Sequence, residues 1–170
     1  RVIKHGRIFK HRFDDRIPLV PFFVFPYLLF YFPWMIGFHV LLLSRTLVEV
    51  QQAVIAIMIA TCIGYVVFCT FSTMVEHHAL KHDNAWSSWI LKFVYENDRR
   101  VNAFPSMHVF MTMLMLLFML KWYGWTSAIF VPVALAILAS TVLTKQHYVH
   151  DITGGIIVGV FSYGLVQYMI

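Results

Sequence analysis

Two groups of polar residues lie at the ends of long apolar runs and carry side chains that can do acid–base and nucleophilic chemistry. The first group, residues 102–108, ends in Ser106 and His108, and the second, residues 144–151, contains Lys145, His147 and Asp151. Polar residues that border apolar membrane segments are candidates for function. These five residues therefore define the candidate site.

Within this candidate site, His147, Asp151 and His108 suggest a division of roles. His147 and Asp151 are four positions apart, so they lie one above the other if a helix begins near His147. A carboxylate there can accept the Nδ1 proton of the imidazole, which leaves Nε2 as a nucleophile. His108 can donate a proton to a leaving oxygen as a general acid.

The same two groups also offer a place for an anion. Pro105 is suited to a first helical turn. Free backbone N–H groups around Ser106 and Met107, together with the helix dipole, then form an anion seat. Lys145 adds a positive charge beside His147. A nucleophile, an acid and an anion seat are the parts that phosphoryl transfer requires.

Membrane-spanning helices are the elements that must position these residues. The chain has 170 residues, of which 60% are hydrophobic and 12% charged, against roughly 25% charged in a soluble domain. Five runs lack Asp, Glu, Lys and Arg, and each is long enough to cross a hydrocarbon core about 30 Å thick as a helix of roughly 20 residues. The sequence predicts an all-α integral membrane protein, with one domain at 17–170 and about five transmembrane helices near 18–43, 51–75, 104–120, 123–143 and 151–169.

Two further segments accompany the predicted bundle. Residues 1–16 form a basic amphipathic arm. In the longest polar connection, Trp86, Trp89 and Phe93 fall on one helical face, opposed by Lys92 and Glu96. This pattern predicts a short amphipathic helix over about 84–97 that lies flat in the membrane interface.

The predicted helices place both polar groups on one membrane face, because two antiparallel helices separate them. The arm, the 77–100 connection and the 145–151 turn share this face, which then holds every Lys and Arg except Arg45 and Lys121. The positive-inside rule favours a cytoplasmic location for this face.

The motifs resemble those of the type 2 phosphatidic acid phosphatase superfamily, which includes membrane lipid-phosphate phosphatases and soluble vanadium haloperoxidases. Residues 105–108, Pro-Ser-Met-His, are similar to its Pro-Ser-Gly-His signature. His147-x3-Asp151 is similar to the second half of its third signature, although Lys145 stands closer to the histidine than the family's arginine, which would fall at Thr141. Asn-Ala-Phe-Pro-Ser-Met-His, with Lys-Gln-His-Tyr, resembles the branch that contains inositolphosphorylceramide and sphingomyelin synthases.

The family's first signature, Lys-x6-Arg-Pro, is absent from the chain. His77 stands where its arginine would be, and a histidine cannot form the bidentate fork that arginine makes with phosphate. Lys81, Arg99 and Arg100 are the nearby cations that can compensate.

The resemblance implies a metal-independent, cofactor-free, two-step reaction. His147 attacks phosphorus and forms a phosphohistidine, Asp151 orients it, and His108 protonates the leaving alcohol. The phosphate-binding residues that the resemblance implies are Lys145, Ser106 and His77. The expected substrate is a lipid phosphomonoester or an isoprenyl diphosphate drawn from the bilayer, and nucleic acid is not an expected partner.

Three other interpretations stay open. The first is a lipid phosphotransferase of the synthase type, in which a second alcohol replaces water. The second is a catalytically degenerate lipid-binding protein, which the missing Arg-Pro favours. The third is a metal- or haem-binding membrane protein, suggested by the nine histidines, although His77, His78 and His82 lack the spacing of a closed zinc site.

Overall fold

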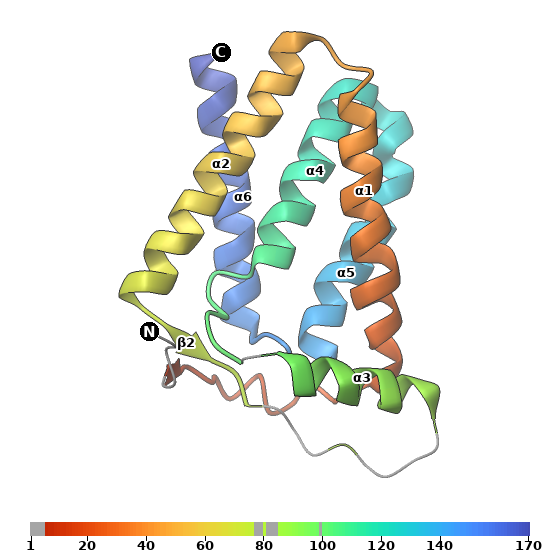
Figure 1. Cartoon of the computed structure of the whole chain (residues 1–170), viewed down its shortest axis with the longest axis vertical. Coiled ribbons are helices and arrows are strands. Elements are labelled where there is room, and N and C mark those ends of the chain that lie inside the picture. The colour runs from red at the N-terminus through yellow and green to blue at the C-terminus, as the bar shows by residue number, and fades with distance from the viewer. Residues whose placement is uncertain (1–5, 77–79, 81–84, 99) are drawn as a thin grey trace.

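A computed structural model describes residues 6–76, 80, 85–98 and 100–170 of the chain. Five helices run side by side as a bundle, and a sixth lies across one end (Figure 1). The elements, in chain order, are β1 (Arg7–Ile8), η1 (Pro21–Phe23), η2 (Pro26–Phe30), α1 (Tyr31–Leu42), α2 (Leu47–Thr70), β2 (Thr73–Met74), α3 (Trp86–Asn97), α4 (Met107–Tyr123), η3 (Gly124–Phe130), α5 (Val131–Leu143) and α6 (Val149–Met169).

Among the described residues, four helical stretches are long and apolar enough to cross a membrane: Pro21–Leu42, Leu47–Thr70, Met107–Leu143 and Val149–Met169. The third of these contains α4, η3 and α5, and the chain reverses at η3, so that α4 and α5 pack against each other (Figure 1). With this stretch divided at η3, the described residues form five segments that run along the bundle. The prediction of an all-α membrane protein with about five such helices and a short interfacial helix, α3, is confirmed.

Local chemistry explains where the first two spans begin. The prolines of the first span break its start into η1 and η2, and the regular helix α1 begins only at Tyr31. Helix α2 begins at Leu47, four residues before the predicted position. There Glu49 N–H donates to Thr46 Oγ1 at 3.3 Å, and Thr46 N–H donates to Glu49 Oε2 at 3.0 Å. This capping box places a charged residue inside the first turn, where a search for charge-free runs does not look.

Helices α4 and α6 approach closely because glycines line their contact. A Cβ atom at Gly155 would lie 2.7 Å from Val109 Cβ and 2.8 Å from the carbonyl oxygen of Ser106, and one at Gly159 would lie 3.0 Å from the carbonyl oxygen of Phe110. The sequence predicts that glycines of the last span permit close helix contact, and these distances confirm it. The two helices that carry His108 and Asp151 are therefore held side by side.

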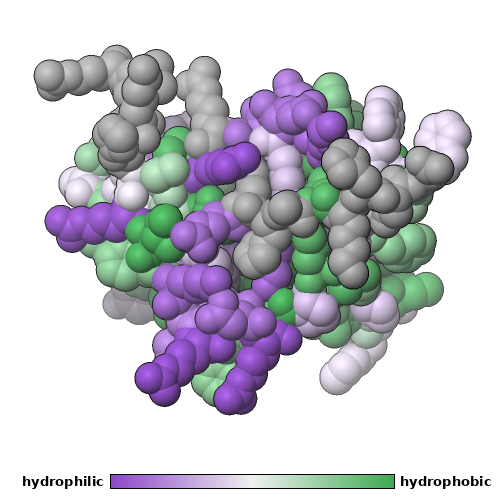
Figure 2. All heavy atoms as spheres, turned by 90° about the horizontal axis from the view of Figure 1, so that it is seen from below, coloured by the Kyte–Doolittle hydropathy of each residue, from purple (hydrophilic) through white to green (hydrophobic). Residues whose placement is uncertain are grey.

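Hydrophilic residues gather at the end of the bundle across which α3 lies (Figure 2). At this end β1 pairs in parallel with β2, Arg7 opposite Thr73 and Ile8 opposite Met74. The N-terminal arm, α3, the start of α4 and the turn before α6 all lie here (Figure 1). The structure therefore brings the two polar groups and the arm to one face, as the helix order requires.

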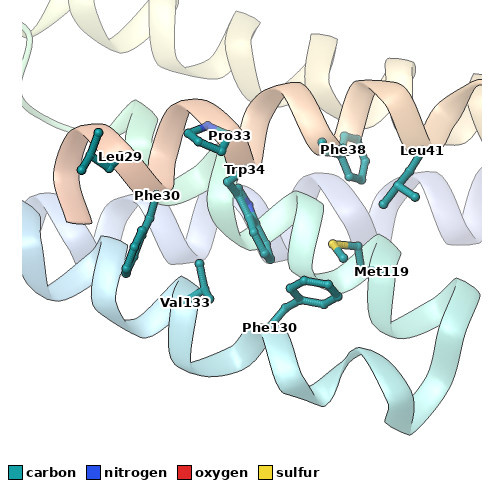
Figure 3. A pocket seen from close by; sticks show the side chains of 10 residues that line it. Leu29, Phe30, Pro33, Trp34, Phe38, Leu41, Met119, Phe130 and Val133 are labelled. Atoms are coloured by element: carbon teal, nitrogen blue, oxygen red, sulfur yellow. The ribbon is translucent and has the colours of Figure 1, made fainter. Parts of the chain in front are cut away.

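An apolar groove of about 420 Å³ lies between α1, α4 and α5 (Figure 3). Its lining includes Leu29, Pro33, Trp34, Leu41, Met119 and Phe130, and none of its ten lining residues is titratable. The groove therefore lacks the side chains for acid–base chemistry, which lie at the polar end of the bundle.

Candidate active site

A pocket of about 210 Å³ opens at the polar end of the bundle and holds both candidate histidines. The polar and charged residues in its lining are Tyr27, Asp98, Arg100, Asn102, His108, Gln146 and His147. They come from η2, from the segment between α3 and α4, from the start of α4 and from the turn before α6. Residues far apart in the sequence thus form one small cavity.

His108 and His147 face each other in this pocket. Their ring centroids are 6.0 Å apart, so one small reacting group can contact both rings, as acid–base catalysis needs. His108 is the second residue of α4, and its ring packs against Tyr27 and Tyr31, with centroids 4.7 and 4.4 Å away. The predicted acid and nucleophile are therefore brought together.

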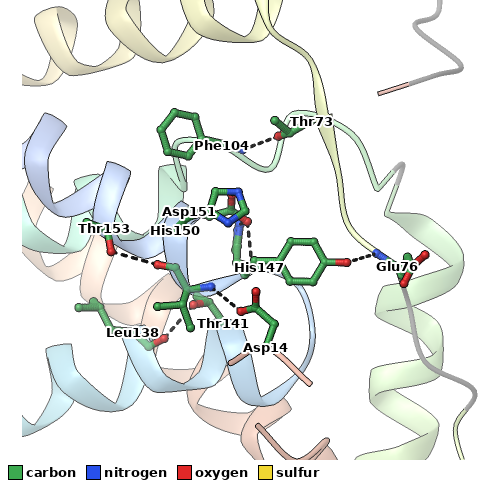
Figure 4. A network of polar contacts seen from close by, with 12 residues as sticks. Asp14, Thr73, Glu76, Phe104, Leu138, Thr141, His147, His150, Asp151 and Thr153 are labelled. Atoms are coloured by element: carbon green, nitrogen blue, oxygen red, sulfur yellow. Dashed lines mark hydrogen bonds and ion pairs between the residues drawn. The ribbon is translucent and has the colours of Figure 1, made fainter. Parts of the chain in front are cut away.

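His147 also meets its predicted partner, Asp151. Its Nδ1 lies 3.4 Å from Asp151 Oδ2, and this carboxylate is fully buried (Figure 4). Helix α6 begins at Val149, so His147 lies in the turn before the helix instead of within it. Two backbone hydrogen bonds hold the pair there: His147 N–H donates to Thr141 O at 3.0 Å, and Tyr148 N–H donates to Asp151 Oδ2 at 2.8 Å.

A second imidazole contacts the same carboxylate. His150 Nε2 lies 3.0 Å from Asp151 Oδ1, and the ring packs beside Phe104 and Tyr148 with centroids 5.7 and 5.9 Å away. Sequence reasoning missed His150, because neighbouring residues on a helix usually point in different directions. Each oxygen of Asp151 thus contacts one histidine, which restrains the carboxylate while Oδ2 faces His147.

One of the N–H groups of the predicted anion seat, that of Ser106, is already engaged in the structure. Ser106 is the N-cap of α4, so Pro105 precedes the cap and does not occupy the first helical turn. Ser106 N–H donates to Asp151 O at 3.1 Å and is therefore already occupied. Instead of offering this donor to a ligand, the fully buried Ser106 joins the start of α4 to the start of α6.

The structure turns Lys145 toward the N-terminal arm. Its Nζ donates to the carbonyl oxygens of Asp14 at 2.8 Å and Ile17 at 2.6 Å, and the residue is only 5% exposed. Burial lowers the pKa of this ammonium, and the nearby charge of Asp14 opposes that shift. Lys145 does not line the pocket that holds His108 and His147. The other predicted phosphate ligand, His77, lies outside the described residues.

Among the described residues, Arg100 is the arginine or lysine that lines the pocket. It has a left-handed backbone, with φ of 59°, as does Asn102, with φ of 63°, a conformation uncommon for residues other than glycine. Two backbone bonds hold this segment: Val75 N–H donates to Arg100 O at 3.2 Å and Asn102 N–H to Thr73 O at 2.8 Å. Arg100 is one of three cations that the sequence offered in place of the missing signature; the other two lie outside the described residues.

Comparison with known proteins agrees with this geometry. No curated protein and no solved structure matches the chain. A family model described as the PAP2 superfamily matches residues 2–165, nearly the whole chain. That match includes α4, most of α6 and the turn between α5 and α6, where the histidines and the aspartate meet. The chain therefore belongs to the PAP2 superfamily, the type 2 phosphatidic acid phosphatases that its motifs resemble, whose members include phosphatases and phosphotransferases.

Proposed function

We propose that the protein is a membrane phosphatase that hydrolyses a lipid phosphomonoester or an isoprenyl diphosphate without a metal ion. The observation that carries this proposal is the meeting of His108 and His147 in one pocket, with Asp151 Oδ2 at 3.4 Å from the Nδ1 atom of His147. Family membership supports phosphatase-type chemistry on lipid phosphates in general. The pocket adds a nucleophile and an acid in reach of one reacting group.

The proposed reaction has two steps. In the first, His147 Nε2 attacks phosphorus, the bond from phosphorus to the leaving oxygen breaks, and His108 gives its proton to that oxygen. Asp151 stabilises the positive charge that develops on His147. In the second, water attacks the phosphohistidine and gives a proton to His108, which releases inorganic phosphate and restores His147.

The position of the pocket supports an amphiphilic substrate. It lies at the polar end of a bundle whose spans are apolar, so a phosphate headgroup can enter while the hydrocarbon chain stays in the bilayer (Figure 2). The positively charged arm also lies at this end, which favours a cytoplasmic location for the active site by the positive-inside rule.

A lipid phosphotransferase is the second candidate function. Asn102 and Gln146 line the pocket, and their amide groups are of a kind that can hydrogen-bond the hydroxyl groups of an acceptor alcohol. In that case the alcohol, and not water, attacks the phosphohistidine in the second step.

The test is release of phosphate by detergent-purified protein from a panel of lipid phosphates and isoprenyl diphosphates, with EDTA present. A His108→Ala, His147→Ala double variant gives the background. Release that persists in EDTA and requires the two histidines supports the phosphatase. If properly folded protein releases no phosphate from any substrate, the hydrolase proposal fails. The same lipids are then offered with acceptor alcohols, and a product that forms only with an alcohol identifies the transferase.

Replacing Arg100 with glutamine should weaken substrate binding more than turnover. Because Arg100 lines the pocket, removing its charge should raise KM about tenfold and change kcat by less than about threefold, the effect of losing one charge-assisted contact to phosphate. Arg100→Lys should recover part of the binding. Lys92→Gln removes an equal charge from an exposed position 3.9 Å from Glu96 and should leave KM unchanged. If Arg100→Gln and Lys92→Gln raised KM equally, the net charge of the protein, and not the cation in the pocket, would control substrate binding.

A further inference from the structure

The N-terminal arm contains one buried carboxylate in an otherwise largely exposed stretch. Asp14 is only 2% exposed, whereas its neighbours Phe13 and Asp15 are exposed. A buried carboxylate is costly unless hydrogen bonds or opposite charges compensate it. The partners of Asp14 therefore indicate what the arm is fixed to.

Both oxygens of Asp14 accept backbone hydrogen bonds, one of them from the helix that follows the nucleophile. Oδ1 accepts from Val149 N–H at 2.9 Å (Figure 4), and Oδ2 accepts from His11 N–H at 2.7 Å. Val149 is the first residue of α6, where N–H groups have no partner within the helix and the dipole favours a negative charge. Asp14 thus caps α6 from a segment 135 positions away in the sequence.

The carboxylate of Asp151, which lies in the first turn of α6, already has other partners. Asp151 Oδ2 accepts from Tyr148 N–H at 2.8 Å and faces His147, while Oδ1 lies 3.0 Å from His150. Asp14 therefore supplies a cap that Asp151 cannot supply without leaving the histidines.

The turn is tied to Asp14 on the other side of His147 as well. Lys145 Nζ donates to the backbone oxygen of Asp14 at 2.8 Å and to that of Ile17 at 2.6 Å. Lys145 itself has a left-handed backbone, with φ of 53°, at the bend of the turn. The residues two before and two after His147 are therefore both bound to Asp14.

We propose that Asp14 is a positioning residue that holds the turn around His147, so that the imidazole faces His108 and Asp151. This inference rests on the proposed function only in taking His147 as the nucleophile. Misplacing a reacting group by about 1 Å can cost about 100-fold in rate, so the bonds that fix this turn act on turnover. Because Asp14 does not line the pocket, its loss leaves substrate binding in place.

The experiment compares Asp14→Ala, Asp14→Asn and Asp15→Ala. Asp14→Ala should lower kcat about tenfold or more and change KM by less than about twofold. Asp14→Asn should stay within about threefold of the wild type, because its side-chain carbonyl oxygen can still accept from Val149. Asp15→Ala is the matched control, since it removes the same charge next door from a carboxylate that is 62% exposed and paired with Lys10; it should behave as wild type.

The rate of hydrogen–deuterium exchange of the backbone amides of residues 146–152 tests the cap formed by Asp14 independently of catalysis. Exchange should be about tenfold faster in Asp14→Ala, the size of a typical helix-cap effect, and unchanged in Asp15→Ala. A wild type that releases no phosphate would defeat the proposed function, while exchange would still test the cap. If Asp14→Ala does not fold, Asp14→Glu is measured in its place. The added methylene moves the carboxylate oxygen away from Val149 N–H, so kcat of Asp14→Glu should fall well below that of Asp14→Asn. Folded Asp14→Ala with kcat within twofold of wild type, Asp14→Asn as impaired as Asp14→Ala, or unchanged exchange would overturn the inference.

Discussion

Replacing His147 with alanine should reduce phosphate release by about a thousandfold or more. The substitution removes the proposed nucleophile, so no phosphohistidine can form, and losses of this size follow when a nucleophile is deleted from a covalent mechanism. The ring is largely buried between His108 and Asp151, and alanine removes it without adding volume. The measurement is kcat on the best lipid substrate, together with a ³²P-labelled reaction quenched in alkaline SDS, which preserves phosphohistidine, to detect phosphoprotein.

A matched control for this substitution is His39→Ala. His39 is an exposed histidine of α1 whose Nδ1 contacts the Met35 backbone oxygen at 2.7 Å, and it does not line the pocket. This variant should keep wild-type activity and should form as much ³²P-labelled phosphoprotein as the wild type. A His147→Ala enzyme that retained more than a tenth of wild-type kcat, or that still formed an acid-labile phosphoprotein, would show that another group attacks phosphorus.

Replacing Gly155 with valine should destabilise the protein and lower its activity together. The first added carbon would lie 2.8 Å from the Ser106 carbonyl oxygen and 2.7 Å from Val109 Cβ, so α4 and α6 must move apart. Overpacking of this kind costs about 1–3 kcal/mol, which corresponds to a melting temperature about 2–12 °C lower. Because Ser106 also bonds Asp151 across this contact, separation should draw His108 away from His147 and reduce kcat.

Gly164→Val provides the control on the same helix. A Cβ atom at Gly164 would meet nothing within 4 Å among the described residues. This variant should therefore match the wild type in melting temperature, followed by tryptophan fluorescence in detergent, and in activity. Equal destabilisation by the two substitutions would mean that helix propensity, and not the α4–α6 contact, explains the loss at Gly155.

Much of the fold follows from local patterns of hydropathy. The charge-free runs predict five spans, because lipid leaves few alternatives to an apolar helix. Trp86, Trp89 and Phe93 predict α3 by their helical spacing, and the structure leaves these three side chains exposed on it. Helix starts are less predictable, since the Thr46–Glu49 capping box places a charge inside α2.

The candidate site divides in the same way. His108, His147 and Asp151 could be predicted because their spacing and the helix order bring them to one face, where the structure gathers them. The direction of Lys145 could not be predicted, because an identical sequence could point this flexible side chain to a phosphate or to the arm. In the structure, Lys145 points to the arm, because its Nζ donates hydrogen bonds to the carbonyl oxygens of Asp14 and Ile17.

By itself, the sequence determined the membrane bundle, the face on which the polar residues lie and the His147–Asp151 pair, since these depend on periodicity and on spans of known length. Only the tertiary structure decided that His150 shares the carboxylate of Asp151, that Arg100 lines the pocket and that Asp14 caps α6. Each of these depends on where a loop or arm comes to rest. Loop position is set by hydrogen bonds between segments distant in the chain, and such bonds leave no periodic trace in the sequence.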